Sequence, residues 1–122
     1  MVQHRSMVKI ADNSGAKMIQ VIQPLGGSGK RLARIGEVFV GVVKSADPNG
    51  QVKAAEIIRA VLVRNKKEIR RNDGSYIKFD ENAAVIIDKD GNIRGSRVFG
   101  PIAKEVKDVG FLKIASLAPE VW

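Results

Sequence analysis

An apolar run at residues 60–63 passes directly into a basic segment at 64–78, and this transition constrains the fold more than any other feature. The basic segment holds six Lys or Arg residues, but its only acids are Glu68 and Asp73. Asp73-Gly74 bends the segment, because a tight hairpin turn needs positive φ and Gly adopts it without strain. The pattern predicts a basic two-stranded ribbon that projects from an apolar sheet or barrel.

Short apolar segments separated by turn residues fill most of the chain before residue 100. Gly, Asn, Asp and Pro cluster between these segments and favour turns. Many short strands spaced in this way are typical of a small barrel, because closure removes exposed strand edges. The sequence therefore predicts a mainly β fold, a small closed barrel. Its expected strands are 8–10, 17–23, 38–43, 56–64, 76–79 and 83–88, with 97–99 as an edge.

The segment at 38–43 does not alternate between apolar and polar residues, so we expect it to be buried on both faces for most of its length. Phe39 and Val42 cannot share one face of a regular strand, because their separation is odd. Either Gly41 marks a bulge, or one face of this strand meets the C-terminal helices.

The last quarter of the chain changes from strand to helix periodicity. Pro101 suits the first turn of a helix, Gly110 suits a helix end, and Pro119 would stop a second short helix. Helices this short are not stable alone, so we expect the region at about 101–119 to pack on the barrel. No linker or repeat is visible, and we expect residues 1–122 to form one domain.

The composition favours a soluble partner of a polyanion. Lys and Arg number 21 against 13 Asp and Glu, which gives a net charge of +8 and a pI of about 10.1. Hydrophobic residues make up 44%, enough for a packed core, and Cys is absent, which excludes thiolate metal sites. No apolar run approaches the roughly 20 residues that span a bilayer, and no apolar leader is visible. We expect a cytoplasmic protein, although a plastid-encoded one would look similar.

Three basic clusters, at 30–34, 64–71 and 94–104, are the candidate binding surfaces. A single run of charge is usually only a solvated face, but three clusters of one sign in loops favour nucleic acid. Aromatic residues make up only 5%, so we expect phosphate and shape contacts rather than base stacking.

Little in the sequence points to catalysis, a metal or a cofactor. The glycine-rich stretch at 26–30 fails the phosphate-loop pattern, because Arg31 stands where Ser or Thr should bind Mg²⁺. His4 has no nucleophile near it in the sequence. Asp80 and Glu81 point to opposite faces if they lie in a strand. We therefore expect no catalytic residue, no metal site and no cofactor.

Several motifs make the chain resemble the universal family of large-subunit ribosomal protein number 14, over essentially all 122 residues. The pattern that runs from 60–63 through Asp73-Gly74, Phe79 and Asn82 to 85–86 is satisfied at every position. The other matching stretches are 11–17, 25–29, 70–71 with 73–77, 79–83, 99–101 and 116–121.

The resemblance implies a five-stranded barrel with a projecting ribbon and two small C-terminal helices. It implies a structural, non-enzymatic role in the large subunit, binding of 23S-type rRNA, and a bridge to small-subunit rRNA. Large-subunit proteins number 3 and number 19 would be neighbours, and in bacteria a ribosome silencing factor would bind the exposed face. We expect rRNA contacts from Lys17, Lys30, Arg31, Arg34, Lys44, Arg64, Lys66, Lys67, Arg70, Arg71 and Lys78. The residues expected to face the small subunit or the factor are Arg94, Ser96, Arg97 and Lys113.

Two other classes of protein stay open at this point. One is a free-standing barrel that binds RNA or DNA outside the ribosome. The other is an enzyme that uses Asp12, Asp80 or Glu81.

Overall fold

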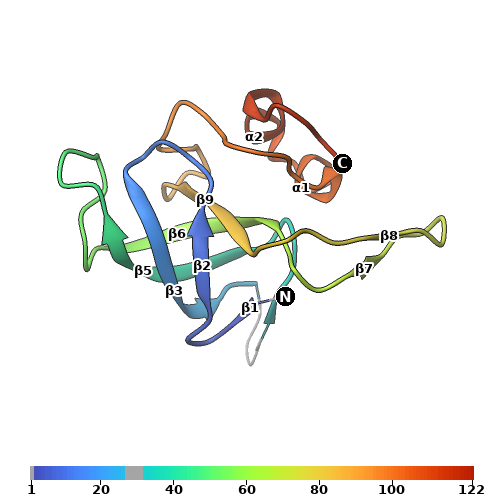
Figure 1. Cartoon of the computed structure of the whole chain (residues 1–122), viewed down its shortest axis with the longest axis horizontal. Helices are drawn as coiled ribbons and strands as arrows, with labels where there is room; N and C mark the ends of the chain where they lie inside the picture. The colour runs from blue at the N-terminus through green and yellow to red at the C-terminus, as the bar shows by residue number, and fades with distance from the viewer. Residues whose placement is uncertain (1, 27–31) are drawn as a thin grey trace.

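The computed structural model describes residues 2–26 and 32–122, and its centre is a closed five-stranded barrel. The barrel strands are β2 (Met7–Ile10), β3 (Ala16–Pro24), β5 (Val38–Ala46), β6 (Ile57–Arg64) and β9 (Ala83–Ile87). They pair in the order β2-β3-β5-β6-β9, and a parallel pairing of β2 with β9 closes the ring, as Figure 1 shows. The predicted barrel is confirmed.

The apolar runs of the sequence supply the core. All five residues of β9 are buried, and β6 is buried on both faces from Ala60 onwards. Neighbouring segments cover the outer side of β6, since Ala103 donates its backbone N–H to the Val63 carbonyl at 3.2 Å. The same apolar cluster includes Val106 and Ile114 from the C-terminal helices. Barrel and helices therefore share one core, while the prediction of a single domain stays a prediction.

The expectation that the segment at 38–43, now β5, is buried on both faces is wrong. Phe39, Gly41 and Val43 are buried and alternate with half-buried residues on the outer face. The irregularity near Gly41 exists, but its extra residue, Ile22, lies in β3, between the pairs Val21↔Gly41 and Gln23↔Val40. A Cβ on Gly41 would approach the Gln20 carbonyl to 3.0 Å, so glycine lets the two strands lie close at this bulge.

The basic segment forms the predicted ribbon, which projects from the barrel in Figure 1. Its strands are β7 (Ile69–Arg70) and β8 (Tyr76–Ile77), which pair antiparallel. Gly74 has φ of 88° and donates its N–H to the Arg71 carbonyl at 3.0 Å. The strand expected at 76–79 is shorter than predicted. A second small pair, β1 (Val2–Gln3) with β4 (Leu32–Ala33), had no recognisable signal in the sequence.

Two short helices follow the barrel, α1 (Lys104–Val109) and α2 (Leu112–Leu117). Gly110, with φ of 121°, ends α1 as predicted, but Pro101 lies ahead of α1 rather than in its first turn. Residues 97–99 form only an isolated bridge, Asp12↔Val98. Among the described residues, no helix is long and apolar enough to cross a membrane.

Candidate nucleic-acid interface

The ribbon carries the exposed cations predicted for it. Lys66, Lys67 and Arg70 are exposed, and none of them has an acidic partner among the residues that the structure describes. The base of the ribbon is fixed, because Lys66 donates its N–H to Asn82 Oδ1 at 2.8 Å and Phe79 donates its N–H to the Asn65 carbonyl at 2.9 Å. These three cations therefore stand on a backbone with a defined path.

The tip of the ribbon is held by a small carboxylate network. Asp73 Oδ1 accepts the Ser75 N–H at 2.9 Å and the Ser75 hydroxyl at 2.6 Å. These bonds to Ser75, with smaller contributions from Lys104 and Arg71, lower the pKa of the Asp73 carboxyl below its usual value. The turn therefore keeps a stable anion that orders the backbone between the two strands.

Arg71 links the ribbon to α1 instead of standing free. Its Nη2 lies 3.0 Å from Glu105 Oε1, and both side chains are largely covered. A groove of about 320 Å³ lies between the ribbon turn and this helix, with Asp73 and Lys104 in its walls. The ion pair holds the ribbon next to α1, so the structure gives Arg71 a positioning contact.

Arg64 was grouped with the ribbon cations, but the structure buries it. Only 7% of its side chain is exposed. Its Nη1 donates to the carbonyls of Phe99 at 2.8 Å and Pro101 at 3.0 Å, and Nη2 donates to Glu81 Oε1 at 3.3 Å. Burial lowers the pKa of the Arg64 guanidinium, and the Glu81 carboxylate opposes that shift. The side chain anchors the segment before α1 to the barrel.

Lys17 on β3 and Lys44 on β5 each lie at a break in the β3–β5 register. The pairs Ala16↔Ala46, Met18↔Ser45 and Ile19↔Val43 leave Lys17 unpaired on β3 and Lys44 unpaired on β5. Both residues are exposed, so the two bulges present two cations at the surface. Arg34 and Lys78 are also exposed, whereas Lys30 and Arg31 lie outside the described residues.

A single side chain, Asn13, holds the turn that carries Ser96 and Arg97. Asn13 Oδ1 accepts the N–H groups of Ser96 at 2.8 Å and Arg97 at 3.1 Å, and Nδ2 donates to the Ser96 hydroxyl at 3.0 Å. The guanidinium of Arg97 lies 5.5 Å from the centre of the Phe99 ring. Both Ser96 and Arg97 are exposed, but these hydrogen bonds fix the backbone of their turn.

The remaining factor-facing candidates differ in exposure. Lys113 is exposed on α2, while Arg94 is only 29% exposed and donates Nη1 to Glu56 Oε1 at 3.3 Å. Asn13 was missed among the site residues, although it lies within the recognised stretch at 11–17. Its partners are 83 and 84 positions away, so only the folded chain brings them together.

The fold and this surface define a class of protein: a small, strongly basic β-barrel with a projecting cationic ribbon and, among the described residues, no cluster able to hold a metal ion. The family model described as Ribosomal protein L14p/L23e matches residues 1–122. The chain therefore belongs to this family of structural proteins of the large ribosomal subunit, for which rRNA binding is expected. The family resemblance of the sequence motifs is confirmed.

Replacing Ser75 should move the titration of Asp73. Ser75→Ala removes the hydroxyl bond, so we expect the pKa of Asp73 to rise toward its ordinary value. Because the folded pKa is depressed, the stabilising effect is present above the unfolded pKa and is lost as pH falls through the folded pKa. A carboxyl ¹³C NMR titration measures the shift, with Ser116→Ala as control. An unchanged pKa would assign the shift to the backbone N–H of residue 75 and the neighbouring cations rather than to the hydroxyl.

Replacing Arg64 should destabilise the fold. Arg64→Ala leaves the Phe99 and Pro101 carbonyls and the Glu81 carboxylate without this donor, and we expect the free energy of unfolding to fall by about 2–4 kcal/mol. Lys67→Ala, on an exposed cation, should change it by less than about 0.5 kcal/mol. Denaturant titration measures both variants. Equal stability of the two would show that Arg64 is not an anchor.

Proposed function

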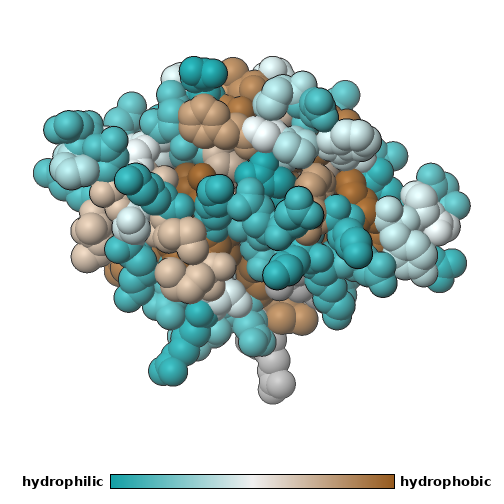
Figure 2. Space-filling model, in the orientation of Figure 1, coloured by the Kyte–Doolittle hydropathy of each residue, from teal (hydrophilic) through white to brown (hydrophobic). Residues whose placement is uncertain are grey.

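We propose that this chain binds 23S-type rRNA in the large ribosomal subunit, mainly through phosphate contacts made by the ribbon. The observation that carries the proposal is the row of exposed cations, Lys66, Lys67 and Arg70, on a ribbon fixed at its base and tip. Contacts of this kind release counterions from the nucleic acid and set register without reading sequence. Figure 2 shows the projecting tip covered mostly by hydrophilic and neutral residues.

Further rRNA contacts are proposed at four other cations. Lys17, Lys44, Arg34 and Lys78 are exposed cations that phosphates can reach. Lys30 and Arg31 stay in the set as sequence predictions. Arg71 contributes by positioning the ribbon through Glu105, and Arg64 is left out because its donors are used within the fold.

We propose that a second surface, formed by Ser96 and Arg97 together with Arg94 and Lys113, faces the small subunit and contributes to a bridge with its rRNA. The support is the exposure of Ser96, Arg97 and Lys113 and the fixed geometry that Asn13 gives the turn. In bacteria a silencing factor would bind here. Large-subunit proteins number 3 and number 19 are the proposed neighbours, and the ribosome of the cytoplasm or of a plastid is the proposed location.

The other classes of function are less well supported. Asp12 is buried and accepts three hydrogen bonds, and Glu81 is paired with Lys9 and Arg64, so neither carboxylate is free for acid–base work. We propose that the chain is one domain without enzymatic activity. Co-sedimentation with large subunits after a high-salt wash separates it from a free-standing RNA or DNA binder.

Neutralising the ribbon should weaken the salt dependence of RNA binding. If Lys66, Lys67 and Arg70 each contact a phosphate, changing all three to Gln should make the slope of log K against log salt shallower by about 2–3 units. A matched variant, Lys53, Lys89 and Lys107 to Gln, has the same charge change at lysines outside the ribbon. Titrations with a large-subunit RNA fragment at several salt concentrations give the slopes. Equal slopes in the two variants would contradict ribbon binding.

Reversing one charge on the second surface should impair subunit joining. We expect Arg97→Glu to weaken joining or factor binding by about tenfold, because it places like charges together. Asn13→Ala should weaken it less, since the turn is loosened but Arg97 stays. Both variants should enter large subunits, and Lys53→Glu is the charge control. Light scattering of subunit mixtures measures joining. Failure of Arg97→Glu to enter large subunits would move Arg97 to the rRNA-binding set.

A further inference from the structure

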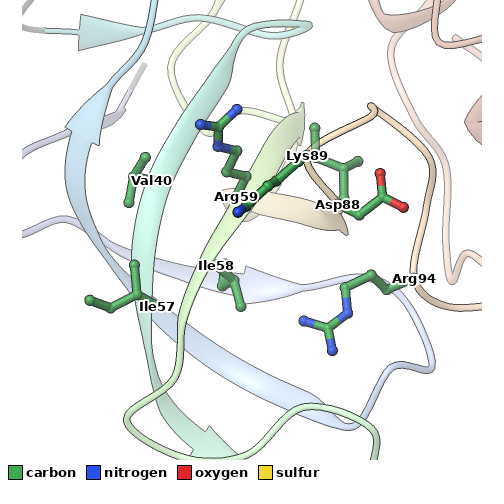
Figure 3. A pocket seen from close by; sticks show the side chains of 8 residues that line it. Val40, Ile57, Ile58, Arg59, Asp88, Lys89 and Arg94 are labelled. Carbon is green, nitrogen blue, oxygen red and sulfur yellow. The ribbon is translucent and has the colours of Figure 1, made fainter.

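A shallow groove on the outside of the barrel has a different character from the ribbon. It has a volume of about 430 Å³ and lies over β5, β6 and the end of β9. Its lining combines aliphatic and basic residues with one acid, namely Val40, Ile57, Ile58, Ile87, Arg59, Lys89, Arg94 and Asp88. Figure 3 shows Val40 and Ile57 on one side of the groove and Asp88 and Arg94 on the other.

The floor of the groove follows from strand pairing. Arg59 on β6 pairs with Val40 on β5 and with Ile87 on β9, so the three residues form one row across the barrel. Ile57 precedes Arg59 by two residues and shares its outward face. At 67% exposure, Ile57 is the most exposed large apolar side chain that the structure describes. Val40 beside it is half-buried, whereas Ile58 and Ile87 are buried beneath them. A large apolar side chain left open among polar residues suits an interaction surface.

The cations around this floor differ in whether an acidic residue pairs with them. In the described part of the chain, Arg59 and Lys89 have no acidic partner, while Arg94 is held by Glu56. The single acid, Asp88, uses Oδ1 to accept the N–H groups of Asp90 and Asn92 within its own turn. The groove therefore presents net positive charge around an aliphatic floor.

We propose that this groove binds an acidic segment of a neighbouring protein in the large subunit, with an aliphatic side chain on the floor and carboxylates on Arg59 and Lys89. Among its described lining residues there is no aromatic ring, whereas unpaired bases are held by stacking. Branched aliphatic groups instead complement another aliphatic side chain, and carboxylates complement the cations above it.

The groove is an anchor point rather than a whole interface. A stable interface buries about 800 Å² per partner, more than a groove of this size supplies. A few central residues carry most of the binding energy in such interfaces, and Arg is one of the residue types enriched among them, which fits Arg59. Ile57 is the central contact of this proposal, and Arg59 sets the charge preference.

Site-specific cross-linking within assembled large subunits tests the proposal. A benzophenone amino acid at position 57 should cross-link to a protein segment that contains an aliphatic residue beside Asp or Glu, identified by mass spectrometry. The same group at position 22, on β3, is the matched control, because Ile22 is exposed but does not line the groove. Cross-linking to rRNA, to a segment without acids, or to nothing would each overturn the proposal.

A second set of variants tests the role of the Arg59 charge. In the position-57 background, Arg59→Glu should lower the cross-link yield by about tenfold, and Arg59→Lys should largely keep it. An undiminished yield with Arg59→Glu would overturn the role of the cation.

Chemical labelling of Lys89 tests the same proposal without the bulky benzophenone amino acid. Lys89 of the natural chain should react with an amine reagent at least about fivefold more slowly in large subunits than in the isolated protein, and Ile57→Ser should abolish that protection. Lys53, outside the groove, is the reference lysine. Equal reactivity of Lys89 in both states would overturn the proposal. The proposal that the ribbon binds rRNA is tested separately, by the slope of log K against log salt. Either proposal can therefore fail while the other holds.

Discussion

The parallel pairing of β2 with β9 is the constraint on which the rest of the structure depends. It joins the start of the barrel to its last strand through Lys9↔Ala83 and Ile10↔Ala84. Because the ring closes there, the residues just after β2 meet the end of the barrel. Asp12 Oδ2 accepts the Ile86 N–H at 2.9 Å, and the Asp12 backbone bridges to Val98. Closure therefore places Asn13 where it can hold Ser96 and Arg97.

Arg64 extends this organisation to the C-terminal region. Its guanidinium reaches the carbonyls of residues on both sides of Gly100. A Cβ at Gly100 would collide with Arg64 Nη1, and the φ of 77° there also favours glycine. Arginine suits this position because its planar guanidinium donates several hydrogen bonds from a buried site. The barrel, the pinned turn and the helices are thus connected through side chains that fit one another closely.

The sequence predicted the features that depend on local chemistry. Asp73-Gly74 indicated the ribbon turn, Gly110 indicated the end of α1, and the spaced apolar runs indicated the barrel. It did not predict that Arg64 is buried, because a cation after an apolar run looks the same whether it faces solvent or carbonyls 35 and 37 residues away. Asn13 was missed for the same reason. The two-residue strands β1 and β4 are too short to leave a periodic signal.

The cations of this chain divide according to what the fold does with them. Arg64, Arg71 and Arg94 each pair with a carboxylate and are mostly covered, whereas Lys66, Lys67 and Lys78, like Arg70 and Arg97, stay exposed. Arginine is the less strongly hydrated cation, so pairing it in partly buried places costs less than pairing lysine. Exposed charges contribute little to folding, which leaves the exposed cations available to a partner. Net positive charge and a stable barrel are therefore compatible in one small chain.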